Sequence, residues 1–193
     1  AEEYKAKLLP FDLVEAQSRL ATMYGNDVPQ DSTQAIKWYR LAAEQGESYA
    51  QFNLGSMYDR GEGVPQDATE AIKWYRLAAD QGIAYAQSKL GIMYSNGNGV
   101  PQDYTEAMKW YRLAAEQGET NAQFNLGVMF ANGEGVPENS VEAYVWFSIV
   151  SAGGMERAKE LIEEYRNKLS PDQLAEAQEK ATARFKQIEE RQG

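Results

Sequence analysis

The sequence predicts an all-α fold, an α/α solenoid of about five helix-pair repeats, and three observations predict it. The four tryptophans stand at positions 38, 74, 110 and 146, so that each interval is 36 residues. The word AIKWYRL at residues 35–41 recurs around the second tryptophan and in related form around the others. A second word, AQFNLG at residues 50–55, returns in related form at 86–91 and 122–127. Repetition at a fixed period of about 20–50 residues is typical of solenoid arrays.

The first helix of each repeat, helix A, is predicted from a stripe of small and apolar residues. In the second repeat Ala50, Leu54, Met57 and Tyr58 recur at the i, i+4, i+7 and i+8 spacing of one helix face. Residues 61–65, Gly-Glu-Gly-Val-Pro, should end this helix, because glycine allows positive φ values and proline removes a helical donor. Val-Pro also occurs at 28, 100 and 136, so the same turn is expected in each repeat.

The second helix, helix B, is predicted to begin at a capping box, an N-cap residue followed three positions later by Glu or Gln. Asp67 and Glu70 form this pattern, and it returns as Asp31 with Gln34, Asp103 with Glu106, and Asn139 with Glu142. Helix B should then run through the tryptophan to a glycine at 46, 82, 118 or 153–154, which is the expected left-handed C-terminal stop.

Both ends of the array depart from the repeat. Residues 25–27 shorten the first turn by two residues, and residues 1–9 are expected to form a leading helix that Pro10 ends. After Ala158, Glu163 stands where earlier repeats have glycine, and residues 170–173, Ser-Pro-Asp-Gln, should open a polar capping helix that runs to about Glu190. We therefore expect one solenoid domain over 1–193, with a leader at 1–10, repeats at 11–46, 47–82, 83–118 and 119–154, and a partial repeat with the capping helix at 155–193.

Composition excludes several classes of function. With 19 Lys plus Arg against 29 Asp plus Glu, the formal charge of −10 disfavours nucleic acid and anionic lipid as partners. The absence of cysteine and histidine removes disulfides, thiolate metal sites and the commonest general base. No run approaches the ~18 apolar residues of a membrane span. We expect no catalytic, cofactor-binding or metal-binding residues, and no membrane insertion.

The recurring words also carry a resemblance to a known family. They are Leu-Gly-x-Met-Tyr in helix A, Gly-x-Gly-Val-Pro-Gln-Asp in the turn and Glu-Ala-x-Lys-Trp-Tyr in helix B. They resemble the Sel-one-like repeats (SLR), relatives of tetratricopeptide repeats, over roughly residues 11–160, and residues 169–178 resemble the ending of bacterial members. The resemblance implies a right-handed superhelix of helix pairs that scaffolds protein complexes and is often exported. Residues 137–139, Val145 and Ser148 depart from the pattern and make the fourth repeat chemically distinct.

Comparison of the repeats with one another separates a scaffold stripe from a variable face of helix A. At ~100° per residue the varying positions fall on one arc opposite the Ala50, Leu54 and Met57 stripe. Helix A carries Ala and Gly at its contacts and helix B carries Trp and Tyr, so helices A should stack closer together and line the concave side. The predicted partner-binding residues of this concave groove are Tyr49, Phe52, Ser56, Asp59, Arg60, Tyr85, Ser88, Ile92, Ser95, Asn96, Asn121, Phe124, Val128, Ala131 and Asn132.

Several patterns have a structural as well as a functional interpretation. The tryptophans share the structural period, which favours packing between helices over ligand stacking. The recurring Gly-x-Gly is a turn, because it lacks the third glycine and the lysine of a phosphate loop. For Phe52 and Phe124, packing between helices and partner binding remain equally open. The free arc of helix B, Thr69, Lys73, Arg76 and Asp80, is expected to be an ordinary charged convex face.

These observations favour a monomeric scaffold or adaptor that binds a peptide, a helix or a folded protein in the concave groove and is not an enzyme. One alternative is a secreted β-lactam or cell-wall enzyme, although the Ser-x-x-Lys motif of that chemistry is absent. Another is a glycan-binding protein that stacks Tyr49, Tyr85 and Phe124 on sugars. The chain begins with Ala1 and no methionine, which fits cleavage by signal peptidase as well as an artificial boundary. We expect a periplasmic or secreted protein, with a cytoplasmic one as the alternative.

Overall fold

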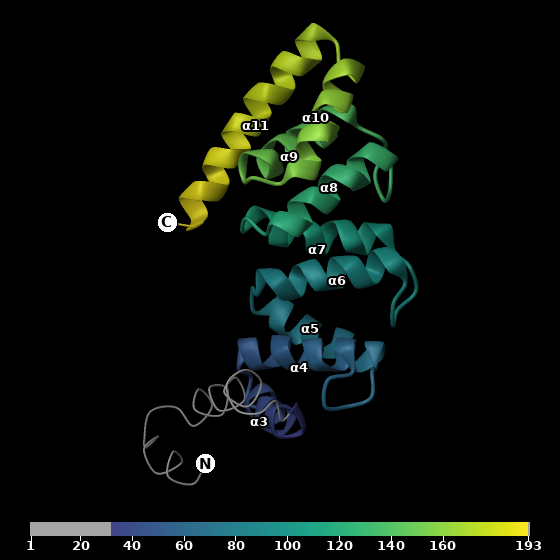
Figure 1. The fold of residues 1–193 in the computed structure, drawn as a ribbon, viewed down its shortest axis with the longest axis vertical. Helices are drawn as coiled ribbons and strands as arrows, with labels where there is room; N and C mark the ends of the chain where they lie inside the picture. The colour runs from purple at the N-terminus through teal and green to yellow at the C-terminus, as the bar shows by residue number, and fades with distance from the viewer. Residues whose placement is uncertain (1–31, 193) are drawn as a thin grey trace. The chain divides into compact units, whose positions relative to one another are not determined.

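The computed structural model describes residues 32–192, and every regular element in that range is an α-helix (Figure 1). The A helices are α4 (Ser48–Arg60), α6 (Ala84–Asn96), α8 (Thr120–Asn132) and α10 (Glu156–Lys168). The B helices are α3 (Ser32–Glu44), α5 (Ala68–Asp80), α7 (Tyr104–Glu116) and α9 (Ser140–Ala152), and the capping helix is α11 (Pro171–Gln192). The predicted all-α fold of repeated helix pairs is confirmed.

The chain divides into two compact units, one ending at Ala86 and the other beginning at Gln87. Four expectations lie outside the described residues: the leading helix at 1–9, the first helix A around Ala16, the short turn at 25–27 and the capping pair of Asp31 with Gln34.

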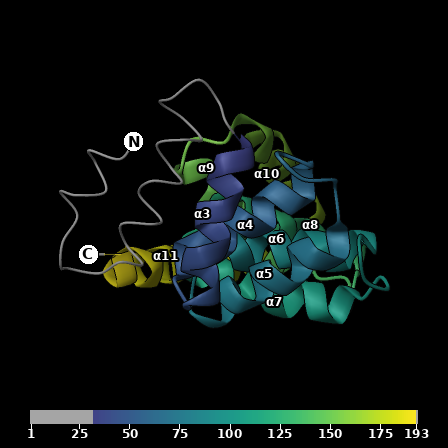
Figure 2. The same cartoon turned by 90° about the horizontal axis from the view of Figure 1, so that it is seen from below.

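In the first unit α4 packs against both α3 and α5 (Figures 1 and 2). The predicted stripe of α4 is in the core: Leu54 is fully buried, and Met57 and Tyr58 are almost so. Tyr75 of α5 is also fully buried. The register predicted for helix A is therefore correct in this repeat.

In the second unit α8 packs against α7 and α9, and α9 also packs against α10 and α11. Figure 1 shows α11, in yellow, running back alongside α9. Ala177, Ala181 and Ile188 place the apolar face of α11 in the core of this unit. α11 therefore covers the last repeat, as a capping helix should.

Side chains cap α4, α5, α7, α8, α9 and α11 at their N-termini. Asp67 and Asp103 each accept hydrogen bonds from the backbone amides two and three residues ahead, and at α11 Ser170 and Gln173 form a complete capping box. In a capping box the side chain three residues after the N-cap also accepts from the N-cap amide. At α5 the Glu70 side chain instead accepts from the indole Nε1 of Trp74 at 3.2 Å. The A helices α4 and α8 begin with acidic caps that the sequence did not indicate, because glutamate is not a preferred N-cap residue; these are Glu47 and Glu119.

A glycine of α4, α6 and α8 lies beneath an aromatic ring of the B helix that follows. A Cβ atom on Gly91 would lie 2.5 Å from the ring of Tyr111, and on Gly127 it would lie 2.6 Å from that of Phe147. Such distances are far shorter than van der Waals contact, so only glycine fits. The predicted role of this glycine, close approach between helices, is confirmed.

Buried glutamine side chains connect consecutive repeats. Gln51 is 4% exposed and donates to the carbonyl of Ala43 in the preceding repeat at 3.1 Å, while its own oxygen accepts from Gln81, at the end of helix B of the same repeat, at 2.7 Å. Gln87 accepts in the same way from Gln117 at 2.8 Å. Because a buried amide is costly when unpaired, the bond to Ala43 fixes helix A on the preceding repeat, and the bonds between glutamines fix it on helix B of its own repeat.

Burial of Tyr111 makes the stability of the fold sensitive to high pH. Burial raises the pKa of this phenol from 10.0 to about 12. A pKa that is higher in the folded than in the unfolded state gives a stability contribution that is complete below pH 10 and is lost as pH rises through 12. Tyr111→Phe should reduce the loss of unfolding free energy between pH 8 and pH 11, measured in urea. Phenylalanine fits this site, since Phe147 occupies it in the next repeat; equal losses in both proteins would contradict the assignment.

Candidate binding surfaces

The first unit carries an aromatic patch, which we define as Tyr49, Phe52 and Tyr85. Tyr49 and Tyr85 are the second residues of α4 and α6 and are 61% and 64% exposed. Phe52 is half-buried, three residues after Tyr49 on the same helix face, and its ring centroid lies 6.3 Å from that of Tyr85 and 5.7 Å from that of Tyr75. Phe52 therefore packs on the core through Tyr75, which confirms the packing interpretation, and it also lies beside the exposed Tyr85; its role in partner binding stays a prediction.

The C-terminal end of α4 is polar. Ser56 and Asp59 are half-buried, and the hydroxyl of Tyr75 donates to Asp59 at 3.4 Å. Burial, followed by the charge of Asp59, raises the pKa of Tyr75 well above its usual range. Arg60 is exposed and pairs with Glu62 at 3.4 Å. Of the predicted residues on α4, the two aromatic ones and Arg60 are therefore the most available to a partner.

The prediction for Ser88 on α6 is wrong, because Ser88 is only 5% exposed. Its side chain is too short to reach the surface, whereas the phenylalanines at the equivalent positions 52 and 124 remain half-exposed. Ile92 is half-buried against the core of the second unit, and Ser95 donates to the carbonyl of Ile92 at 3.0 Å. Only Asn96 among these α6 residues is exposed.

On α8 the variable face has polar ends and a partly covered apolar middle. Asn121 stands where the second and third repeats have tyrosine, and its amide donates to Glu119 at 2.9 Å. The ring of Phe124 lies 5.7 Å from that of Phe147, and the guanidinium of Arg157 lies 5.4 Å from its centroid. Val128 and Ala131 pack against the core, and the exposed Asn132 donates to Glu134 at 3.1 Å.

The B helices combine packing tryptophans with exposed leucines. Trp74 and Trp146 are 6% and 5% exposed, and Trp38 and Trp110 are half-buried, in agreement with the predicted packing role. The expectation of an ordinary charged face is wrong in one respect. Leucines at one equivalent position of α3, α5 and α7 are exposed by 44%, 41% and 47%; they are Leu41, Leu77 and Leu113.

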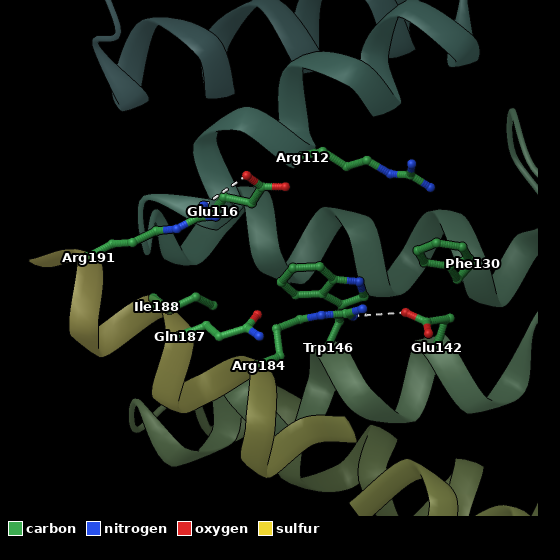
Figure 3. A pocket seen from close by; sticks show the side chains of 9 residues that line it. All are labelled: Arg112, Glu116, Phe130, Glu142, Trp146, Arg184, Gln187, Ile188 and Arg191. Carbon is green, nitrogen blue, oxygen red and sulfur yellow. Dashed lines mark hydrogen bonds and ion pairs between the residues drawn. The ribbon is translucent and has the colours of Figure 1, made fainter. Parts of the chain in front are cut away.

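A pocket of about 510 Å³ opens in the second unit between α7, α8, α9 and α11 (Figure 3). Two ion pairs cross it: Arg184 to Glu142 at 2.8 Å, and Arg191 to Glu116 at 2.9 Å. The pocket is lined by Arg112, Glu116, Phe130, Glu142, Trp146, Arg184, Gln187, Ile188 and Arg191. No pattern in the sequence predicts it, because its walls come from segments up to 79 residues apart, from Arg112 to Arg191.

In residues 32–192 no group of three or more Asp, Glu, His or Cys side chains is placed to hold a metal ion. Within the same range, no helix has the length and apolarity needed to cross a membrane.

Comparisons with known proteins agree with the geometry. The Sel1 repeat matches residues 14–47, 48–83, 84–119 and 120–154. A Sel1 repeat protein from Oxalobacter formigenes is 30% identical with a TM-score of 0.79, over 93% of this chain and 78% of that one. A protective antigen of uropathogenic Escherichia coli that displays an SLR fold is 43% identical with a TM-score of 0.76, over 81% of this chain.

The chain spans only 34% of the length of the Escherichia coli antigen. The cysteine-rich protein B of Helicobacter pylori is 24% identical with a TM-score of 0.54, over 71% of this chain and 98% of that one, and it supports the fold alone. The comparison with curated proteins gave no match. Four matched repeats cover most of the sequence, and the chain therefore belongs to the Sel1 repeat family.

Proposed function

We propose that this chain is a scaffold that binds a protein partner through the aromatic patch of its first unit. Proteins built from Sel1 repeats are generally scaffolds for protein interactions and are typically without enzymatic activity. The observation that carries the proposal is the exposure of Tyr49 and Tyr85, 61% and 64%, at equivalent positions of consecutive A helices. Exposed aromatic residues that gather on one face are typical of partner recognition.

The patch has the features of a pre-organised anchor site. Phe52 is fixed between the rings of Tyr75 and Tyr85, so little side-chain entropy is lost when a partner covers it. The two tyrosines offer apolar ring faces with a hydroxyl at the end, which suits an apolar side chain flanked by polar backbone groups. We infer that the partner presents an extended segment or a helix, in the groove that the repeats predict.

The first experiment identifies the partner by contact with the patch. A photo-reactive benzoylphenylalanine at position 85, in cells of the source organism, should crosslink one dominant protein after irradiation. The same probe at Lys109, which is exposed on a B helix, serves as the control for chance contact. The crosslinked protein, identified by mass spectrometry, then supplies the ligand for affinity measurements.

Replacing both Tyr49 and Tyr85 by alanine should weaken binding of that partner by about 2–4 kcal/mol, since each aromatic anchor contributes ~1–2 kcal/mol. The melting temperature should hardly change, because both rings are mostly exposed. Isothermal titration calorimetry measures the affinity. The matched control is the Leu41→Ala and Leu77→Ala pair, which removes comparable exposed apolar groups from the B helices. If the leucine pair abolishes binding and the tyrosine pair does not, the partner occupies the B face and the proposal is wrong.

A further inference from the structure

We propose that the pocket of the second unit is a binding site for a carboxylate joined to an apolar group, with the guanidinium of Arg112 receiving the carboxylate. This site lies among α7, α8, α9 and α11 of the second unit and is independent of the aromatic patch. No part of the proposed scaffold function requires it.

The pocket exists because α11 is longer than the helices of the repeats. α11 has 22 residues, whereas α3 to α10 have 13 each. Its thirteenth residue is Ala183, and all four pocket residues that it supplies come later; these are Arg184, Gln187, Ile188 and Arg191. A capping helix of ordinary length would cover the last repeat without forming this wall.

Three arginines and two glutamates line the pocket, and two of the arginines are already paired. Arg184 and Arg191 form the two ion pairs described above, and Lys180 also approaches Glu142 at 3.8 Å. Among the described residues Arg112 has no carboxylate partner, and its contact is the ring of Phe130, 5.9 Å from the guanidinium carbon. Three positive and two negative charges leave a balance of 3 − 2 = +1 in a chain whose net charge is −10.

Comparison with the first unit shows why Arg112 lacks a polar partner. The equivalent arginine of α3, Arg40, donates a hydrogen bond to the hydroxyl of Tyr58. Two repeats later Phe130 occupies the position of Tyr58, so the acceptor is missing while the arginine remains. Figure 3 shows the Arg112 side chain extending along the α7 side of the pocket, with no dashed line to any of the residues drawn.

The rest of the wall fits an apolar group. The indole of Trp146 lies at the centre of the pocket, with the Arg184 guanidinium 4.6 Å from its ring, and Phe130 and Ile188 flank it (Figure 3). A volume of about 510 Å³ is within the range of about 300–1,000 Å³ that is usual for small ligands. One guanidinium without a carboxylate partner among the described residues, in a pocket whose charges sum to +1, favours a ligand with a single negative charge, such as a carboxylate.

The test is a titration of the full chain with N-acetyl-L-phenylalanine. NMR monitors the ¹⁵N-labelled indole signals of the four tryptophans during the titration. The Trp146 signal should shift in a saturable manner, and N-acetyl-L-phenylalaninamide, which lacks the carboxylate, should leave it unchanged. A peptide ending in phenylalanine with a free carboxylate forms a second arm. If the free acid and the peptide both bind, the site accepts a chain end; if only the free acid binds, it takes a small molecule. Either result supports the carboxylate site.

Arg112→Gln should weaken the binding of N-acetyl-L-phenylalanine at least about tenfold, because a charge-assisted hydrogen bond is lost. Arg112→Lys should restore part of the affinity. Arg112 is exposed, so these variants should fold, and melting curves verify this. The matched control is Arg40→Gln, the same change at the equivalent position of the first unit. Equal binding of the amide, unchanged affinity in Arg112→Gln, or tighter binding of inorganic phosphate would each overturn the proposal.

Discussion

Replacing Gly91 by leucine should lower the free energy of unfolding by about 2–4 kcal/mol, the largest effect expected of any single substitution in α6. A Cβ atom at this position would lie within 2.8 Å of three ring carbons of Tyr111, which is itself only 3% exposed. The ring cannot move away without opening the packing between α6 and α7. Urea unfolding followed by circular dichroism measures the change.

The matched control adds the same side chain at an exposed position of the same helix. Asn96→Leu should change the unfolding free energy by no more than about 0.5 kcal/mol, as most surface substitutions do. Gly91→Ala should fall between the two, because one methyl group already meets the ring. If Gly91→Leu is as stable as Asn96→Leu, the close contact between these helices is wrong.

Deletion of residues 170–193 should destabilise the second unit and cause it to associate. α11 places Ala177, Ala181 and Ile188 in the core, and Leu174 and Phe185 pack partly buried against it. Each large apolar side chain contributes up to about 1.5–3 kcal/mol when buried, so the melting temperature should fall by at least about 5 °C. The uncovered face of α9 would then be free to pair with another copy.

Size-exclusion chromatography with light scattering measures the association of the truncated protein. We expect the full chain to be a monomer in the same measurement. Ala177→Glu offers a second test without deletion, because it places a charge at a position with no solvent exposure and should detach α11. Glu179→Ala, on the exposed side of the same helix, is the control. A truncated protein that remains monomeric and melts unchanged would show that α11 is an independent appendage.

The helices could be predicted from the sequence because each boundary depends on local chemistry. Asp67 and Asp103 cap their helices through amides two and three residues away, and Gly82 adopts a left-handed φ of 91° where helix B stops. Gly91 was recognised because the repeats agree with one another at this position. Such signals need no knowledge of which segments meet in space.

The candidate sites were predicted less completely, because exposure depends on neighbouring helices. The buried face of helix A was predicted correctly from periodicity. Periodicity alone cannot show that a serine at position 88, on the opposite face, falls short of the surface. Predicting the pocket would require knowing which distant segments meet in the fold. Arg184 and Glu142 are separated by 42 residues, and their pairing follows only from the path of α11 across α9.

The buried glutamines show which parts of this chain are interchangeable. Gln51 and Gln87 accept from a glutamine at the end of helix B of the same repeat, Gln81 and Gln117. Gly153 stands at that position in the fourth repeat, so the equivalent donor to Gln123 is missing there, while Gln123 keeps its bond to the carbonyl of Ala115 in the preceding repeat. A copy of residues 83–118 carries both the glutamine and its donor, and we expect it to be accepted between two repeats. A copy of residues 119–154 carries only the glutamine, so the repeats are not equivalent as building blocks.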